Sequence, residues 1–399
     1  MKNRSLATIL AVSALVLGKV ASRPLDSVTR SGSEQPGVLQ DIQVVSNPKT
    51  PLRGEMTLDL REELSIGSDD DERQAFYGPP QLAVDYPGRF FVLDSGNSRL
   101  QIFDRDAKYV RTIGRPGQGP GDLNRPSSVE VGADGVILVF QPPSRLSLFD
   151  RDGRFQKVID FLPAPQSLIR LGDSGFLGSV IQSGPEVSRD QAVLFDAQGR
   201  QARTLAAFEN ENLFSFVGSE IIGIYQPFKP HLWCVSLPEG RAAFAFSKDY
   251  RIHVLDRSGQ TVRIIIKDEE PERITDGEKE RAIDNEVGLR RNRRLSVSRD
   301  EVKRTMLFPK NRPFFWGLFS DDRSRIYVLK SGDYRKDGFM NYDVFDPRGI
   351  YIKKIRIAVT GRMLPKLIRD GCLYAVAVDE EGLFSIKKYS ISNWNELVN

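Results

Sequence analysis

Few of the side chains that most often carry out catalysis occur in this chain. Its 399 residues include two histidines, His231 and His253, and two cysteines, Cys234 and Cys372. A zinc site that needs three imidazoles therefore cannot be built from the sequence. A Ser-His-Asp triad through His231 stays open, although the Gly-x-Ser-x-Gly elbow that would support it is missing. We expect both cysteines to be buried thiols, since cysteine packs as a small apolar residue.

Six charged or aromatic side chains are candidates for contacts with a ligand. They lie on or beside long connections between apolar segments, and large aromatic and basic side chains carry much of the energy of binding. One of them, His231, lies beside Trp233 and follows the segment 225–230, which reads Tyr-Gln-Pro-Phe-Lys-Pro. The candidates are Arg125, Lys229, His231, Arg312, Trp316 and Tyr334.

A short pattern recurs along the chain and predicts the elements that position these side chains. An apolar run ends in Phe or Leu and is followed by Asp-x-x-Gly or Asp-x-x-Ala. The aspartates of the five copies are Asp104, Asp150, Asp196, Asp256 and Asp346. The first three copies keep a 46-residue spacing, seen at Phe103, Phe149 and Phe195. A strand-rich repeat of about 40 to 50 residues is typical of β-propeller blades.

Turn signals divide residues 55–399 into six blades of short strands. The sixth blade, near Leu367, lacks both the recurring pattern and a fourth strand. The segment 61–67 resembles the segment 108–114, which is the expected outer strand of the first blade. We therefore predict an all-β, six-bladed β-propeller in which residues 56–66 supply the missing strand of the last blade. Such closure removes an exposed sheet edge and locks the ring.

Two segments around the first blade carry a resemblance to a known family. Segment 92–104 reads Val-Leu-Asp-Ser-Gly-Asn-Ser-Arg-Leu-Gln-Ile-Phe-Asp, and segment 117–126 reads Gly-Gln-Gly-Pro-Gly-Asp-Leu-Asn-Arg-Pro. They resemble the NHL-repeat and related six-bladed β-propeller proteins of bacteria. The resemblance weakens in the third blade and is limited to the overall architecture in the last three. It implies the fold and a role as a binding platform, because propellers host many unrelated functions.

Every long connection is expected on one face of this propeller. Connections between blades, and those between the second and third strands, share this long-loop face, and short turns occupy the opposite face. Long connections on a rigid scaffold are commonly functional. The longest, about 268–312 between blades four and five, is predicted to be helical, because Thr275 and Ser298 each begin a capping box. We interpret its basic run 290–294 as solvated surface rather than an anion contact.

We therefore expect a monomeric binding or scaffold protein that presents its long-loop face to a protein, peptide or glycan. The sequence favours a protein without a cofactor and without catalysis. The alternative is a calcium-dependent, lactonase-like hydrolase or lyase that acts at the central channel. Propellers of that type hold calcium with Glu, Asn and Asp, and such ligands are scattered over several strands and leave no local motif.

The first 22 residues have the pattern of an export signal. Lys2 and Arg4 precede an apolar stretch of 13 residues from Leu6 to Gly18, and small residues for cleavage follow at 20–22. An uncleaved anchor is the alternative, although the stretch is short for a membrane span.

Cleavage after residue 22 would change the charge and the compartment of the protein. It removes Lys2, Arg4 and Lys19 and lowers the formal net charge from +4 to +1, which argues against a nucleic-acid partner. We expect a periplasmic or secreted protein without stable membrane insertion. Its leader, residues 23–54, is polar enough to be flexible.

Overall fold

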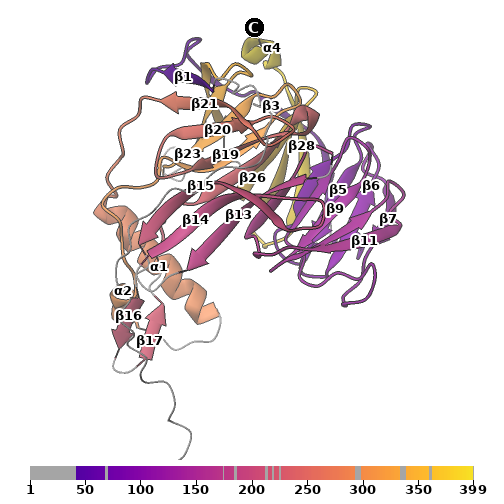
Figure 1. Cartoon of the computed structure of the whole chain (residues 1–399), viewed down its shortest axis with the longest axis horizontal. Helices are drawn as coiled ribbons and strands as arrows, with labels where there is room; N and C mark the ends of the chain where they lie inside the picture. The colour runs from indigo at the N-terminus through magenta and orange to yellow at the C-terminus, as the bar shows by residue number, and fades with distance from the viewer. Residues whose placement is uncertain are drawn as a thin grey trace, which may run out of the picture. The chain divides into compact units, whose positions relative to one another are not determined.

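The computed structural model describes residues 42–67, 71–173, 175–183, 187–211, 214–217, 220–223, 226–292, 298–332, 338–358 and 362–398. The predicted signal peptide, residues 1–22, lies outside these ranges. Within them, six sheets form the blades of a propeller (Figure 1), and each blade contains four antiparallel strands. The sheets of blades four and five each have a fifth, parallel strand. The predicted fold class, a six-bladed β-propeller closed by an N-terminal strand, is confirmed.

Each blade begins with an inner strand and continues outwards through hairpins. Blade one contains β4 (Gln81–Val84), β5 (Phe90–Asp94), β6 (Arg99–Phe103) and β7 (Tyr109–Ile113). Blade two contains β8 (Ser128–Val131), β9 (Ile137–Gln141), β10 (Arg145–Phe149) and β11 (Phe155–Asp160). Blade three contains β12 (Ser167–Leu171), β13 (Gly175–Ser183), β14 (Val187–Phe195) and β15 (Gln201–Glu211).

The remaining blades follow the same order. Blade four contains β18 (Leu232–Leu237), β19 (Arg241–Phe246), β20 (Arg251–Leu255) and β21 (Thr261–Lys267). Blade five contains β22 (Phe315–Ser320), β23 (Ile326–Lys330), β24 (Phe339–Phe345) and β25 (Tyr351–Ala358). Blade six contains β26 (Arg362–Arg369), β27 (Cys372–Val378), β28 (Phe384–Ile391) and the N-terminal β3 (Leu60–Ile66). A separate hairpin, β16 (Phe214–Val217) and β17 (Glu220–Gly223), follows blade three in the sequence.

The recurring aspartate closes the turn between the third and fourth strands of a blade. In blade one, Oδ1 of Asp104 accepts hydrogen bonds from the main-chain N–H groups of Asp106 and Lys108, both at 2.9 Å. Asp150, Asp196, Asp256 and Asp346 make the same pair of contacts. The last residue of the motif takes a positive φ, 80° at Gly153, which glycine adopts without strain. The motif is therefore a turn device on the short-turn face.

The hydrophobic core is divided among the interfaces between neighbouring blades. Buried Leu93 and Ile137 belong to the cluster between blades one and two, and corresponding clusters lie between each later pair. The cluster that joins blade six to blade one contains Ile386, Phe90 and, from β3, the fully buried Ile66. The ring is therefore closed by apolar packing as well as by strand pairing.

The N-terminal segment runs along three blades in turn. β1 (Gln43–Asn47) adds a parallel strand to β21 of blade four, and β2 (Glu55–Thr57) adds one to β25 of blade five. β3 then pairs antiparallel with β28. Two expectations are corrected: residues 43–47 of the predicted flexible leader form a strand, and the closing strand begins at residue 60 rather than 56. The reason is that the outer edges of blades four and five offer unpaired main-chain groups that these residues satisfy. Residues 23–41 lie outside the described part of the chain.

Asn47 fastens this segment to blade five. Its side chain is buried, with Nδ2 donating to the carbonyl oxygens of Gly349 at 2.9 Å and Ile266 at 3.2 Å. Its Oδ1 accepts from the main-chain N–H of Tyr351 at 2.7 Å. One amide group therefore holds the outer strand of blade four, the outer turn of blade five and β1 together.

The connection between blades four and five contains two helices. α1 (Asp276–Asn292) begins at the capping box of Thr275 and Glu278, and α2 (Arg299–Arg304) begins at that of Ser298 and Glu301. They pack through Ile283, Val287, Val302 and Met306. A short α4 (Trp394–Val398) ends the described chain. Among the helices of the described residues, none has the length and apolar character needed to cross a bilayer.

Replacing Asn47 with Ala should lower the free energy of unfolding by about 1 to 3 kcal/mol, because buried main-chain groups of Gly349 and Tyr351 lose their partners. Urea denaturation followed by circular dichroism measures this loss. Ser46→Ala is the control, since Ser46 lies on the same strand but is exposed, and its loss should stay below about 0.5 kcal/mol. Equal losses in both variants would contradict the role of Asn47.

Candidate functional site

The long-loop face of blades three to five brings together three of the six predicted residues. The segment 226–231 leads into β18, and Lys229 Nζ donates to Ser188 Oγ of blade three at 3.4 Å. The Phe228 ring lies 5.9 Å from that of Trp316 and 6.2 Å from that of Phe308. We call the following residues the loop-face site: Asp190, Phe228, Lys229, His231, Phe308 and Trp316.

The backbone of the loop-face site is fixed by local contacts. Pro227 and Pro230 restrict φ in the segment 226–231. The main-chain N–H of His231 donates to Ser247 Oγ at 2.9 Å, which ties the segment to blade four. Trp316 occupies a bulge of β22, because Phe315 pairs with Lys330 and Gly317 with the next residue, Leu329. A bulge leaves one residue unpaired and redirects its side chain.

Burial and charge shift two ionisable groups of the loop-face site. Asp190 is 4% exposed, and burial raises the pKa of its carboxyl, against the hydrogen bond from Asn210 and the charges of Lys229 and His231. Burial lowers the pKa of His231, against the charge of Asp190. Both shifts favour the neutral form. A carboxyl with a perturbed pKa beside basic and aromatic side chains is a candidate for function.

The arrangement suits recognition of a ligand with both apolar and polar parts. Phe228, Phe308 and Trp316 are each half-buried, so part of each ring is accessible. Lys229 and His231 supply donors beside them, and Asp190 supplies a carboxyl. Aromatic rings of this kind provide contact area at a low cost in side-chain entropy, and the polar groups orient what binds.

The other three predicted residues lie elsewhere or outside the described chain. Arg312 pairs with Glu278 of α1, with 3.1 Å between Nη2 and Oε2, and its side chain is 11% exposed. Arg125 is exposed in the loop before β8, where its N–H donates to Ser98 Oγ at 3.3 Å. Tyr334 falls among the residues that the structure does not describe. Their roles as ligand contacts remain predictions.

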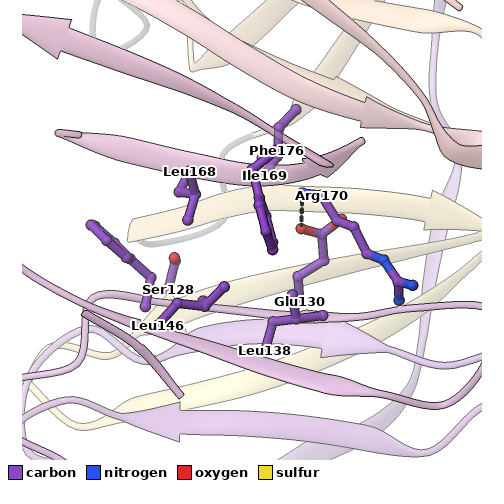
Figure 2. Close-up of a pocket in the computed structure, with 9 residues that line it drawn as sticks. Ser128, Glu130, Leu138, Leu146, Leu168, Ile169, Arg170 and Phe176 are labelled. Carbon is purple, nitrogen blue, oxygen red and sulfur yellow. Dashed lines mark hydrogen bonds between the residues drawn. The ribbon is translucent and has the colours of Figure 1, made fainter. Parts of the chain in front are cut away.

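A carboxyl that sequence reasoning missed links the inner strands at the centre of the ring. Glu130 of β8 accepts from the main-chain N–H of Arg170 at 2.9 Å (Figure 2). It also accepts from Ser236 Oγ at 2.7 Å. It thus connects blades two, three and four, and burial raises its pKa. The adjoining pocket has a free volume of about 10 Å³, room for about one water molecule. The surroundings of Glu130 therefore suit a structural link better than a substrate site.

Two further observations bear on catalysis. His253 stacks on Phe244 with ring centroids 4.6 Å apart and an interplanar angle of 3°, as expected for a structural histidine. Among the described residues, no three His, Cys, Asp or Glu side chains form a group that could hold a metal ion. The calcium-dependent alternative stays an untested expectation.

Comparisons with known proteins agree on the architecture. A family model described as a 6-bladed β-propeller matches residues 78–162, which span blades one and two. No protein with a curated description matches the chain.

Solved structures are similar across most of the chain. A Bacteroides fragilis protein that is thought to be exported has 12% identity and a TM-score of 0.53, with 88% of this chain and 100% of that one covered. A DUF4221 family member from Bacteroides vulgatus has 13% identity and a TM-score of 0.47, with 84% and 99% covered. Regucalcin of Agrobacterium tumefaciens, a calcium-binding protein, has 12% identity and a TM-score of 0.41, with 87% and 97% covered. At such identities the likeness shows the fold alone.

Replacing Glu130 with Ala should lower the free energy of unfolding by about 1 to 3 kcal/mol, because the donors on Arg170 and Ser236 lose their acceptor. Glu130→Gln keeps one acceptor oxygen, and its amide N–H can donate to the Ser236 hydroxyl, so its loss should be smaller than that of Glu130→Ala. Urea denaturation of both variants measures the difference. An equal loss in both would contradict this role.

The half-buried imidazole of His253 should make stability depend on pH. Burial, with a smaller contribution from Arg251, lowers its pKa to about 4, and in the unfolded chain the pKa is about 6.5. Between these values the unfolded chain binds more protons, so stability should fall as the pH drops from about 6.5 to about 4. His253→Gln should reduce that fall by roughly 1 to 3 kcal/mol. Thermal unfolding of the wild type and of His253→Gln across this pH range measures the effect. The same dependence of stability on pH in both proteins would disprove the assignment.

Proposed function

We propose that this chain is an exported β-propeller that binds a protein, peptide or glycan through its long-loop face, without catalysing a reaction. The observation that carries the proposal is the loop-face site, where three half-buried rings lie next to Lys229, His231 and the buried Asp190. Such rings, when surrounded by oriented polar groups, are the usual anchors of binding sites.

The chemistry of the site indicates what the ligand presents. Phe228 and Trp316 offer ring faces to an apolar surface, such as one side of a sugar ring or a peptide side chain. Lys229 offers a positive charge to an acidic or carbonyl group, and Asp190 offers a carboxyl to a donor. Burial raises the pKa of Asp190, and a donor from the ligand would lower it again by stabilising the ionised form.

The remaining parts of the proposal concern where and how the protein acts. Residues 1–22 direct export as a signal peptide, which places the mature chain in the periplasm or outside the cell. Blades one and two belong to the NHL type of repeat. The mature protein works as a monomer, without inserting into the membrane and without binding nucleic acid.

Wild-type protein should bind members of a glycan array or of a displayed random-peptide library, and the bound members identify the ligand class. Trp316→Ala and Lys229→Ala should each weaken binding by about tenfold or more, because each removes a central anchor. Calorimetric titration with a selected glycan or peptide measures the change. The same titration in EDTA tests the calcium-dependent alternative. Full loss of binding in EDTA would favour that alternative.

Matched controls come from the opposite face. Tyr86 is 91% exposed in a turn of blade one, and Lys108 is exposed in another, so Tyr86→Ala and Lys108→Ala should leave the affinity unchanged. The proposal is wrong if the controls lose binding while the loop-face variants keep it, or if neither library yields a ligand.

A further inference from the structure

A pocket rich in arginine lies on the short-turn face of blade five, opposite the loop-face site. It is formed by the turn between β22 and β23, the turn between β24 and β25, and the N-terminal segment just before β2. Its free volume is about 310 Å³. The residues that line it, which we call the turn-face pocket, are Arg53, Arg323, Arg325, Asp346, Pro347, Arg348 and Ile352.

The arginines that line the pocket carry more positive charge than its one lining carboxylate, Asp346, can balance. Asp346 pairs with Arg348 at 2.9 Å. Arg53 and Arg323 are exposed, and no ion pair of either side chain is found within the described part of the chain. Two further acids of neighbouring turns, Asp322 and Asp370, lie beside each other, where the N–H of Asp370 donates to Asp322 Oδ2 at 3.0 Å. The charge of Arg323 acts on Asp370 but is not neutralised by contact with it.

Arg325 is buried, and one of its nitrogens has no hydrogen-bond partner among the residues that the structure describes. Its Nε binds Asp321 Oδ2 at 2.6 Å, and its side chain is 5% exposed. The guanidinium carbon lies 4.6 Å from the centroid of the Trp394 ring, which fixes the orientation of the group. No hydrogen bond from its Nη2 is found among the described residues. Arg325 therefore contributes a fixed positive charge beneath the pocket that it lines, and this charge favours an anion there.

The sequence of this turn differs from that of the other blades. Where Arg348 lies, two residues after the recurring aspartate, blades one and two have Asp106 and Asp152. Blades three and four have Gln198 and Ser258. Blade five is therefore the one copy with a basic residue at this position, although the turns of blades one, two and four carry an arginine one residue earlier. The same blade contributes Arg323 and Arg325.

We propose that the turn-face pocket binds a phosphate or sulfate group. Several guanidinium groups around one cavity match the oxygen geometry of these anions, because each presents its N–H donors in a planar fork. The cavity is larger than one such ion, which leaves room for the small molecule that carries it as an ester. This site is separate from the loop-face site and does not depend on the function proposed for it.

Titration of the full-length mature protein with inorganic phosphate, inorganic sulfate and glycerol 3-phosphate tests the proposal. Each should bind and raise the melting temperature more than sodium chloride does at the same ionic strength. Tighter binding of glycerol 3-phosphate than of phosphate would assign the site to an ester, and the reverse order would assign it to the free ion. Both results support the pocket, and no binding of any of the three overturns it.

Variants locate the bound anion. The double variant Arg53→Gln and Arg323→Gln should weaken binding at least tenfold, because it removes two charged donors. The single variant Arg323→Gln should show an intermediate loss. The matched control is Arg105→Gln with Arg151→Gln. These two exposed arginines lie in the turns of blades one and two that correspond to the turn between β24 and β25. Equal losses in the control and the pocket variant would show that binding follows net charge, and would overturn the site.

Discussion

Closure of the ring is the constraint on which the rest of this structure depends. Each blade buries both of its faces only when it has a neighbour on each side, so the contact between the first and last blades matters to all six. That contact combines two terms: the strand pairing of β3 with β28 and the apolar packing around Ile66 and Phe90. Without β3, blade six would keep an open edge and the cluster would lose Ile66. Pairing of β1 and β2 with blades four and five holds the chain in place before it reaches that position.

Buried polar groups then set how neighbouring blades meet. Between blades four and five, the Asp343 carboxylate accepts from Tyr250 at 2.5 Å and Tyr351 at 2.6 Å, and it pairs with Lys267 at 2.8 Å. Lys267 and Asp343 are almost fully buried, so such a pair is tolerated because its hydrogen bonds are satisfied. Glu130 makes an equivalent link at the centre of the ring. These contacts are directional, unlike apolar packing, and they favour one relative position of the blades.

A rigid ring allows its two faces to differ in function. On the long-loop face, the hairpin of blade three and the segment 226–231 place aromatic, basic and acidic side chains together although they come from separate blades. On the short-turn face, the recurring Asp-x-x-Gly turn saturates its own hydrogen bonds, and in blade five it also carries Arg348, which lines one pocket with Arg323 and Arg325 of another turn. In both cases the scaffold is unchanged and the irregular positions carry the chemistry.

The sequence by itself determined the blades, because the signals that define them act within a few residues. Asp104 and its four equivalents bond to main-chain groups two and four residues ahead, and β3 was found because it resembles a strand of blade one. The structure has Lys229 and His231 in the connection that leads into β18 and Trp316 near the start of β22, while their roles as ligand contacts stay predictions. Only the tertiary structure decided the roles of Asp190, Glu130 and Asn47, whose partners lie 20 to more than 300 residues away. Such partners meet through the closed ring, and neither local spacing nor composition encodes which distant side chains a blade brings into contact.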